Sequence, residues 1–266
     1  MKKSLKKRAT LITSFAIVIT LFSGVNAAAQ SALNGREVMS RVFDRQQPTD
    51  IRSTLEMILR TKRGDERSRN ALQIIGNFDG VQKKILFITA PALVRNTAFM
   101  NFSYDGNENE QWIYLPAFGS VRAISSSGGN EGFMGSDFAF DDMVQRHPSR
   151  DVHTVIRKET LKGREFYVVE SVFPDDDSAY GRTVTWVADD IWIGLRREFY
   201  DAKEVLVKTL EVDELEQTGS FWTITEMTMT TLKSGHSTTM KLSDLTINSG
   251  LTEDYFSEER MKIGIE

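Results

Sequence analysis

Histidine, serine and carboxylate side chains could carry out acid–base or nucleophilic chemistry, so they are considered first. The 266-residue chain has histidines at positions 147, 153 and 236 and no cysteine. None of the three lies in a local pattern typical of a nucleophile–base pair, because the neighbour of His236, Ser237, points to the opposite face of a strand. Neither a Gly-x-Ser-x-Gly elbow nor a His-Glu-x-x-His motif is present. We therefore predict no catalytic residues, and only a triad assembled from distant positions, as in a lipid hydrolase, stays open.

Two groups of carboxylates are the candidate metal ligands. Asp137, Asp141 and Asp142 lie close together, and residues 175–177 form an acidic run. Ca²⁺ takes carboxylate oxygens from one loop, but neither group has EF-hand spacing. We interpret Asp137 as a helix N-cap before Phe138 or as the partner of an arginine, and the run at 175–177 as a solvated turn. The sequence predicts no metal site and no cofactor.

Large apolar side chains suggest the binding of hydrocarbon instead. Aromatic residues and methionines recur along the candidate strands, and methionine adapts its shape to flexible acyl chains. For any one of them, ordinary core packing is the simpler interpretation. The residues predicted to form an apolar hollow and its lid are Phe87, Trp112, Tyr114, Phe133, Met134, Phe138, Phe140, Met227 and Met229.

The stretch from Phe133 to Phe140 differs from the other apolar residues in its setting. It follows a Ser/Gly-rich linker at residues 125–129, which is typical of a flexible loop. A cluster of this kind must be buried against the core or against a ligand. We predict that it forms a movable lid over the hollow.

Most of the chain that must position these residues has the period-two alternation of strands, with short turns such as Asp79-Gly80 and Lys162-Gly163 between neighbours. This spacing predicts an antiparallel meander and excludes parallel βαβ units with a Rossmann-type site. The predicted strands are Arg52–Lys62, Ala71–Phe78, Lys84–Thr89, Ala98–Tyr104, Gln111–Leu115, Val121–Ile124, Val152–Thr160, Arg164–Val172, Arg182–Ala188, Trp192–Tyr200, Val205–Glu211, Phe221–Thr231 and Ser237–Ile247.

Helices are predicted only near the ends of the mature chain. Ser31 to Asp44 has Asn34 as N-cap with Glu37 three residues later, and residues 253–262 form a short closing helix. A long meander either closes into a barrel or covers its inner face with something else. We expect a mainly β fold, a single antiparallel sheet curved into an open, incomplete β-barrel, covered by the N-terminal helix and a short helical or loop lid.

The N-terminus has the layout of a secretory signal. Five basic residues precede an apolar run from Leu11 to Phe22, and Ala27 to Ala29 supply the small residues of a cleavage site. We predict a signal peptide at residues 1–29 and one lipid-binding domain at residues 30–266, located in the periplasm. An uncleaved anchor is the alternative, but the run is short for a span of about 20 residues.

Charge and cysteine content narrow the function further. Loss of the leader removes five basic and no acidic residues, so the formal net charge moves from −4 to −9. This charge argues against nucleic acid as a partner and against electrostatic docking on anionic lipid. Without cysteine the chain has no thiol for lipid attachment and no disulfide. It is therefore not itself a lipoprotein.

Several motifs resemble the periplasmic lipoprotein-sorting proteins of the LolA-like family. The pattern Trp-x-Tyr-Leu-Pro-Ala begins at Trp112, Val-Arg-x-Ile begins at Val121, and Phe-Met-Gly-Ser-Asp-Phe-x-x-Asp-Asp begins at Phe133. Weaker matches continue through residues 192–209 and 238–257, so the resemblance spans most of the mature chain.

The resemblance implies an incomplete barrel whose apolar hollow holds acyl chains. It also implies an arginine that holds the lid by hydrogen bonds to its backbone; Arg60, Arg95 and Arg122 are the candidates, although no position aligns securely. The implied partners are lipoprotein acyl chains or free lipid, an inner-membrane exporter and an outer-membrane acceptor.

The expected function is therefore a soluble periplasmic carrier that moves the acyl chains of lipoproteins or lipids toward the outer membrane. A first alternative is a free-lipid or sterol-binding accessory of an RND-type exporter. A lipid hydrolase is the second alternative and predicts a serine or carboxylate facing the hollow within reach of a histidine. A domain with a filled core is the third, and it predicts no pocket.

Overall fold

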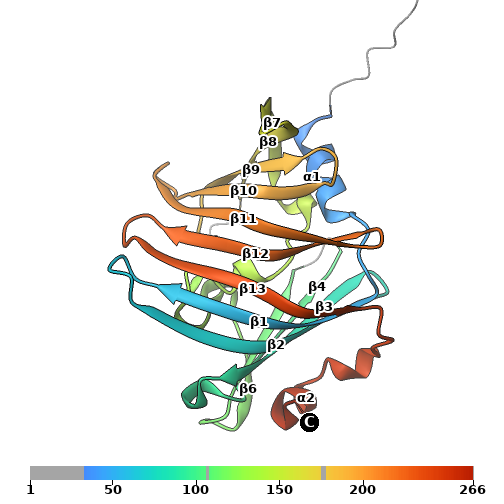
Figure 1. Ribbon diagram of the computed structural model, residues 1–266, viewed down its shortest axis with the longest axis vertical. Helices are drawn as coiled ribbons and strands as arrows, with labels where there is room; N and C mark the ends of the chain where they lie inside the picture. Colours follow the sequence, from blue (N-terminus) through green and yellow to red (C-terminus); the bar gives the residue numbers. More distant parts are fainter. Residues whose placement is uncertain (1–32, 106–107, 175–177, 266) are drawn as a thin grey trace, which may run out of the picture. The chain divides into compact units, whose positions relative to one another are not determined.

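Antiparallel strands make up most of residues 33–105, 108–174 and 178–265, the parts of the chain that the computed structural model describes (Figure 1). The predicted signal peptide and the acidic run at 175–177 lie outside the described residues. The strands are β1 (Asp50–Arg60), β2 (Glu66–Phe78), β3 (Val81–Ala90), β4 (Ala98–Ser103), β5 (Glu110–Leu115), β6 (Ser120–Ala123), β7 (Val152–Leu161), β8 (Arg164–Val172), β9 (Arg182–Ala188), β10 (Ile193–Tyr200), β11 (Leu206–Thr218), β12 (Phe221–Thr231) and β13 (His236–Ile247).

All of these strands belong to one 13-stranded sheet with the order β6-β5-β4-β3-β2-β1-β13-β12-β11-β10-β9-β8-β7. Two hairpin meanders, β1–β6 and β7–β13, are joined by the antiparallel pairing of β1 with β13. The sheet curves but does not close, because β6 and β7 form its opposite edges. The predicted open, antiparallel β-barrel with an N-terminal helix is confirmed.

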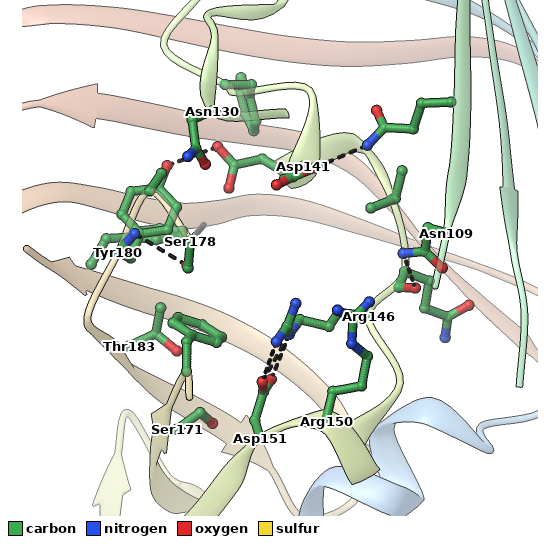
Figure 2. A pocket seen from close by; sticks show the side chains of 18 of the residues that line it. Asn109, Asn130, Asp141, Arg146, Arg150, Asp151, Ser171, Ser178, Tyr180 and Thr183 are labelled. Carbon is green, nitrogen blue, oxygen red and sulfur yellow. Dashed lines mark hydrogen bonds and ion pairs between the residues drawn. The ribbon is translucent and has the colours of Figure 1, made fainter. Parts of the chain in front are cut away.

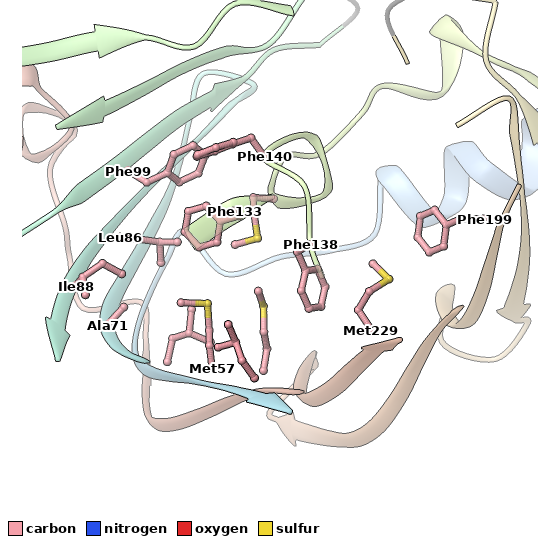
Figure 3. Close-up of a cluster of buried hydrophobic side chains, with 14 of the residues drawn as sticks. Met57, Ala71, Leu86, Ile88, Phe99, Phe133, Phe138, Phe140, Phe199 and Met229 are labelled. Carbon is pink, nitrogen blue, oxygen red and sulfur yellow. The ribbon is translucent and has the colours of Figure 1, made fainter. Parts of the chain in front are cut away.

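The connection between β6 and β7 follows from this strand order. Since its ends lie at opposite edges of the sheet, residues 124–151 must cross from one edge to the other. They do so on the concave side (Figure 3). The crossing contains the short 3-10 turns η2 (Ser126–Asn130), η3 (Phe133–Gly135), η4 (Asp141–Met143) and η5 (Pro148–Arg150).

Helix α1 (Gly35–Phe43) covers the β7–β8 end of the sheet. The side chain of Asn34 accepts a hydrogen bond from the Glu37 N–H at 3.0 Å, and the Glu37 carboxylate accepts from the Asn34 N–H at 2.7 Å. This reciprocal box satisfies two N–H groups at the helix start. A Cβ atom at Gly35 would lie 2.4 Å from the His153 backbone, so only glycine permits the helix to approach β7 this closely.

The C-terminal end is more broken than predicted. The 3-10 turn η6 (Glu253–Tyr255) is separated from helix α2 (Glu258–Ile263) by Phe256, whose side chain is buried. Ser257 then caps α2 by accepting from the Arg260 N–H at 3.2 Å. The remaining 3-10 turn is η1 (Ala92–Val94). Across the described ranges, none of the helices combines the length and the apolar character needed to cross a bilayer.

The two faces of the sheet bury different clusters, because alternate residues of a strand point to opposite sides. On β3, Ile85 and Phe87 face the convex side and pack with Phe256 and Met261 of the C-terminal segment. Leu86 and Ile88 face the concave side and belong to the largest cluster. The concave cluster is the one that contacts the crossing segment.

Candidate functional site

The centre of the concave side is occupied by residues 131–143, which we call the plug segment (Figure 3). Gly132 bridges to Ala139, and the Phe133 N–H donates to the Phe138 carbonyl at 2.7 Å. The chain reverses at Met134 and Gly135, which have φ values of 53° and 75°. Two successive positive φ values are typical of a type I′ hairpin turn. The predicted lid is thus a tight hairpin.

Phenylalanine rings fill the space between the plug segment and the sheet. Phe133 is fully buried, and its ring centroid lies 5.2 Å from that of Phe99 on β4 and 5.4 Å from that of Phe140. Phe138 points toward Met229 of β12 (Figure 3). Aromatic pairs at these separations and angles gain energy beyond simple burial. The plug segment is packed as core in this conformation.

Asp137 fixes the plug segment to three side chains of β12 and β13. Its Oδ1 accepts from Thr231 Oγ1 at 2.6 Å, and its Oδ2 accepts from Thr238 Oγ1 at 2.7 Å. His236 Nδ1 lies 2.7 Å from the same Oδ2. The interpretation of Asp137 as a helix N-cap or arginine partner is wrong, because residues 136–138 lie outside any helix and the buried carboxylate contacts Thr231, Thr238 and His236.

Three cationic side chains of the concave wall donate to backbone carbonyls of the plug segment. Arg69 Nε on β2 lies 2.9 Å from the Met134 oxygen, and Lys208 Nζ on β11 lies 2.7 Å from the Asp137 oxygen. Lys84 Nζ on β3 lies 2.7 Å from the Met143 oxygen. The wall therefore contacts the backbone near both ends of the segment.

The three arginines proposed for this contact from the sequence lie elsewhere. Arg60 pairs with Glu66 at 2.6 Å on an exposed hairpin end, Arg95 donates to Thr89 O at 2.9 Å, and Arg122 lies over the ring of Phe118. Arg69 makes the contact instead. Its position opposite Met57 in the β1–β2 register places it on the concave face, which the sequence alone did not reveal.

Lys84 provides a prediction on pH dependence. Burial lowers the pKa of Lys84 from 10.5 to about 8. Between these values the unfolded chain keeps a proton that the folded chain has lost, so the free energy of unfolding should rise with pH in this window. Relative to a Lys84→Met variant, the wild type should gain about 2 kcal/mol between pH 7 and about pH 9.5. Urea unfolding at both pH values measures this difference.

The control is Lys83→Met on the opposite face of β3, where the ammonium pairs with Glu253 at 2.6 Å. The free energy of unfolding of this variant should still increase with pH as it does in the wild type. An equal rise in the Lys84→Met protein would show that Lys84 does not cause it.

The plug segment leaves part of the hollow open. A cavity of ≈ 910 Å³ lies between α1, residues 144–151 and the concave faces of β8 to β12 (Figure 2). This volume is within the range of about 300–1,000 Å³ typical of small-molecule sites. Its apolar lining includes Met39, Val42, Phe43, Phe138, Phe173, Phe199, Leu210, Met227 and Met229.

The cavity wall also contains polar and charged side chains, which the sequence did not predict. Arg146 Nη2 pairs with Asp151 Oδ1 at 2.7 Å (Figure 2). Asp141 accepts from Gln111 Nε2 at 2.9 Å, and burial raises the pKa of Asp141. Asp142 accepts from the hydroxyl of Tyr180 at 3.0 Å, and burial likewise raises its pKa. The cavity thus has an apolar side and a polar side.

The predicted site residues divide into three groups in the structure. Phe138, Met227 and Met229 line the cavity, whereas Phe133, Met134 and Phe140 are packed in the concave cluster. Phe87, Trp112 and Tyr114 belong to the convex cluster beneath the C-terminal segment, although Trp112 also borders the cavity. The parity of the strands explains this division, because Phe87 points away from its neighbours Leu86 and Ile88.

Two histidines lie beside serine hydroxyls. His153 Nδ1 is 2.7 Å from Ser171 Oγ, and both residues line the cavity. His153 Nε2 is 2.9 Å from the Pro148 carbonyl, which can only accept, so Nε2 is the protonated nitrogen and Nδ1 accepts from the serine. Burial lowers the pKa of His153, which favours this neutral form.

His147 Nδ1 lies 2.6 Å from Ser149 Oγ, and its Nε2 lies 2.8 Å from Asp105. Ser149 is exposed, and its N–H also donates to His147 Nδ1 at 3.1 Å, as in a helix cap. In the described ranges, no cluster of three or more His, Asp and Glu side chains is arranged to hold a metal ion.

Comparisons with known proteins agree with this geometry. A protein-family model described as an uncharacterized protein matches residues 80–263. No curated protein matches the chain. Among solved structures, the chain is similar to a domain assigned to the outer membrane lipoprotein-sorting proteins from Vibrio parahaemolyticus. The two are 31% identical, the match covers 86% of this chain and 98% of that domain, and the TM-score is 0.81.

Two further structures share the fold. A DUF1329 family protein from Desulfovibrio piger is 26% identical, with 85% of this chain and 97% of that one covered and a TM-score of 0.80. A LolA superfamily protein from Nitrosomonas europaea is 18% identical, with 86% and 100% covered and a TM-score of 0.68, which shows the fold alone. The open sheet, the plugged hollow and the similarity to the domain from Vibrio parahaemolyticus together show that the chain belongs to the family of outer-membrane lipoprotein-sorting proteins, with the fold of the LolA superfamily.

Proposed function

We propose that the protein is a periplasmic carrier that holds the acyl chains of lipoproteins or lipids on the concave face of the sheet and moves them toward the outer membrane. The observation that supports this best is the ≈ 910 Å³ cavity with its apolar wall of aromatic and methionine side chains. Burial of hydrocarbon gains about 0.8 kcal/mol per CH₂, so one long chain could contribute on the order of ten kcal/mol. Binding of this kind requires no covalent chemistry.

The plug segment would regulate access to the hollow. Its rings pack on the concave face between Phe99 of β4 and Met229 of β12, and Phe138 forms part of the cavity wall. Its polar contacts with Arg69, Lys208 and the partners of Asp137 hold it against the wall and must be exchanged for water when it moves. Movement of the segment away from the wall would admit cargo to the cavity, and its return would close over the bound acyl chain, without unfolding of the sheet.

Native mass spectrometry of the protein purified from periplasm tests the proposal. We expect a co-purifying acylated molecule, either an acylated peptide or a free lipid, whose release requires denaturation or detergent. A preparation that carries no lipid and does not bind a fluorescent fatty acid would contradict the carrier function. The mass of the cargo also separates a lipoprotein carrier from an accessory of an RND-type exporter, which would hold a free lipid or a sterol.

A lipid hydrolase is the second candidate, because Ser171 and His153 form the hydroxyl–imidazole contact that this alternative requires. The Pro148 carbonyl orients the imidazole, as the third member of a triad would. Ser171 is only 3% exposed, however, and lies within β8 instead of on a tight turn. Ester hydrolysis that is lost in both Ser171→Ala and His153→Gln would establish this activity, whereas the carrier proposal expects no turnover in any of the three proteins.

A further inference from the structure

Arg197 is the charged group of the cavity wall with the fewest protein partners. It lies on β10 opposite Thr185 of β9, and its Nε donates to Thr185 Oγ1 at 3.0 Å. No carboxylate in the described parts of the chain is within ion-pair distance of its guanidinium; Asp142 and Asp151 act on it only at longer range. Burial lowers the pKa of Arg197. A buried cation without a direct counter-ion is costly unless something else compensates it.

The neighbouring charges of the cavity already have partners within the protein. The carboxylate of Asp151 pairs with Arg146, and that of Asp141 accepts from Gln111. Asp142 accepts from the Ala139 N–H at 2.7 Å as well as from Tyr180. Arg150 lies 4.0 Å from Glu108 at the rim. In the described part of the chain, by contrast, the two Nη groups of Arg197 make no hydrogen bond or ion pair within the protein.

Apolar side chains continue directly from this cation. Phe199 is two residues along the same strand and shares its face, with its ring centroid 5.9 Å from the guanidinium carbon. Phe43 of α1 and Met227 and Met229 of β12 line the same cavity. A ligand that reaches Arg197 with a polar end would thus lay the rest of its length along hydrocarbon-binding surface.

We propose that Arg197 binds the anionic headgroup of an acyl amphiphile, a carboxylate or a phosphate, while the acyl chain lies along the apolar wall of the cavity. This inference rests on the proposed carrier function and specifies its cargo. The planar guanidinium presents paired N–H donors that match both anions in bidentate geometry. The lipid end of an acylated peptide, which is joined through ester and amide groups, has no such anion, so a free anionic lipid fits this site better.

Binding of three ligands with the same acyl chain tests the inference: a fluorescent fatty acid, the matching fatty alcohol and the matching lysophosphatidic acid. The wild type should bind one or both anions at least about tenfold more tightly than the alcohol, as expected for charge-assisted hydrogen bonds. The tighter of the two anions identifies the headgroup class. Arg197→Met should lose this preference but bind the alcohol as the wild type does, which also shows that the variant is folded.

Arg196→Met is the matched control, because Arg196 is the adjacent residue and pairs with Glu198 at 2.8 Å. Arg196→Met should still bind the anionic ligands more tightly than the alcohol. Arg197→Lys retains the charge without the paired donors and should show an intermediate preference; it replaces Arg197→Met if that variant does not fold. Equal wild-type affinity for the alcohol and for both anions would overturn the headgroup site and leave the carrier function intact. Failure of all three ligands to bind would instead overturn the carrier function.

Discussion

Asp137→Ala should lower the free energy of unfolding by about 3–5 kcal/mol, the range found when one partner of a buried charged network is removed. The carboxylate accepts from Thr231 and Thr238 and contacts His236, so its loss leaves these groups of the sheet wall without their partner. It also frees the plug segment from β12 and β13. Urea unfolding at neutral pH measures the loss, and the dissociation rate of a fluorescent fatty acid should increase.

Asp213→Ala is the control for this change. Asp213 on β11 also accepts from a threonine, Thr228 Oγ1 at 2.7 Å, but its side chain is exposed. Its replacement should cost less than about 1 kcal/mol, since exposed polar contacts exchange readily with water. If the two variants lose similar stability, Asp137 does not hold the plug segment as its hydrogen bonds indicate.

Replacement of Phe138 and Phe140 together by serine should release bound acyl ligand at least about tenfold faster. Each ring is buried, and deletion of a buried phenylalanine costs about 3–5 kcal/mol of packing. A large part of that energy holds the plug segment in the hollow, and a change of 1.4 kcal/mol in the barrier corresponds to about tenfold in rate. Stopped-flow displacement of a fluorescent fatty acid measures the rate.

Phe256→Ala separates this effect from a general loss of stability. Phe256 is 5% exposed and packs on the convex face with Ile74 and Met261, away from the cavity. We expect it to lower the free energy of unfolding by a similar amount per ring without changing the release rate. An unchanged release rate in the double variant would remove the plug segment from the path of the ligand.

The strands could be predicted from local sequence, because period-two alternation marks segments in which every second side chain is buried. Some strands are longer than predicted, because the apolar alternation ends before the backbone pairing does. β2 begins at Glu66 and β11 continues to Thr218, in polar stretches where backbone pairing with β1 and β12 continues beyond the buried region. Backbone hydrogen bonds do not require apolar side chains, so hydrophobicity does not mark these ends.

The candidate site was harder to predict because its contacts join distant residues. Asp137 was visible as an isolated aspartate, but its partners lie about 100 positions further along the chain and meet it only when β12 and β13 form the wall. The apolar character of the Phe-rich stretch was evident. Its burial as a hairpin depends on β6 and β7 lying at opposite edges of the sheet, which forces the connection across the concave face.

The contact of His153 with Ser171 depends on a register shift of one residue between β7 and β8. The turn at Lys162-Gly163 sets the pairing of Leu161 with Arg164, and an unbroken register from there would place His153 opposite Val172. An irregularity between Val155 and Arg157 shifts the pairing by one residue, so His153 meets Ser171 instead.

Local sequence was enough to predict an antiparallel β protein with a capped N-terminal helix and an unusual Phe-rich segment after a Ser/Gly-rich linker. These features depend on alternation, capping and composition, which act between residues close in the chain. Three features required the folded chain: which arginines line the cavity, which carboxylate anchors the plug segment, and the presence of charged side chains beside the apolar ones in the cavity wall. These features depend on strand order, on bulges and on the side of the sheet that each residue faces. Pairing between strands that are distant in the chain determines each of these.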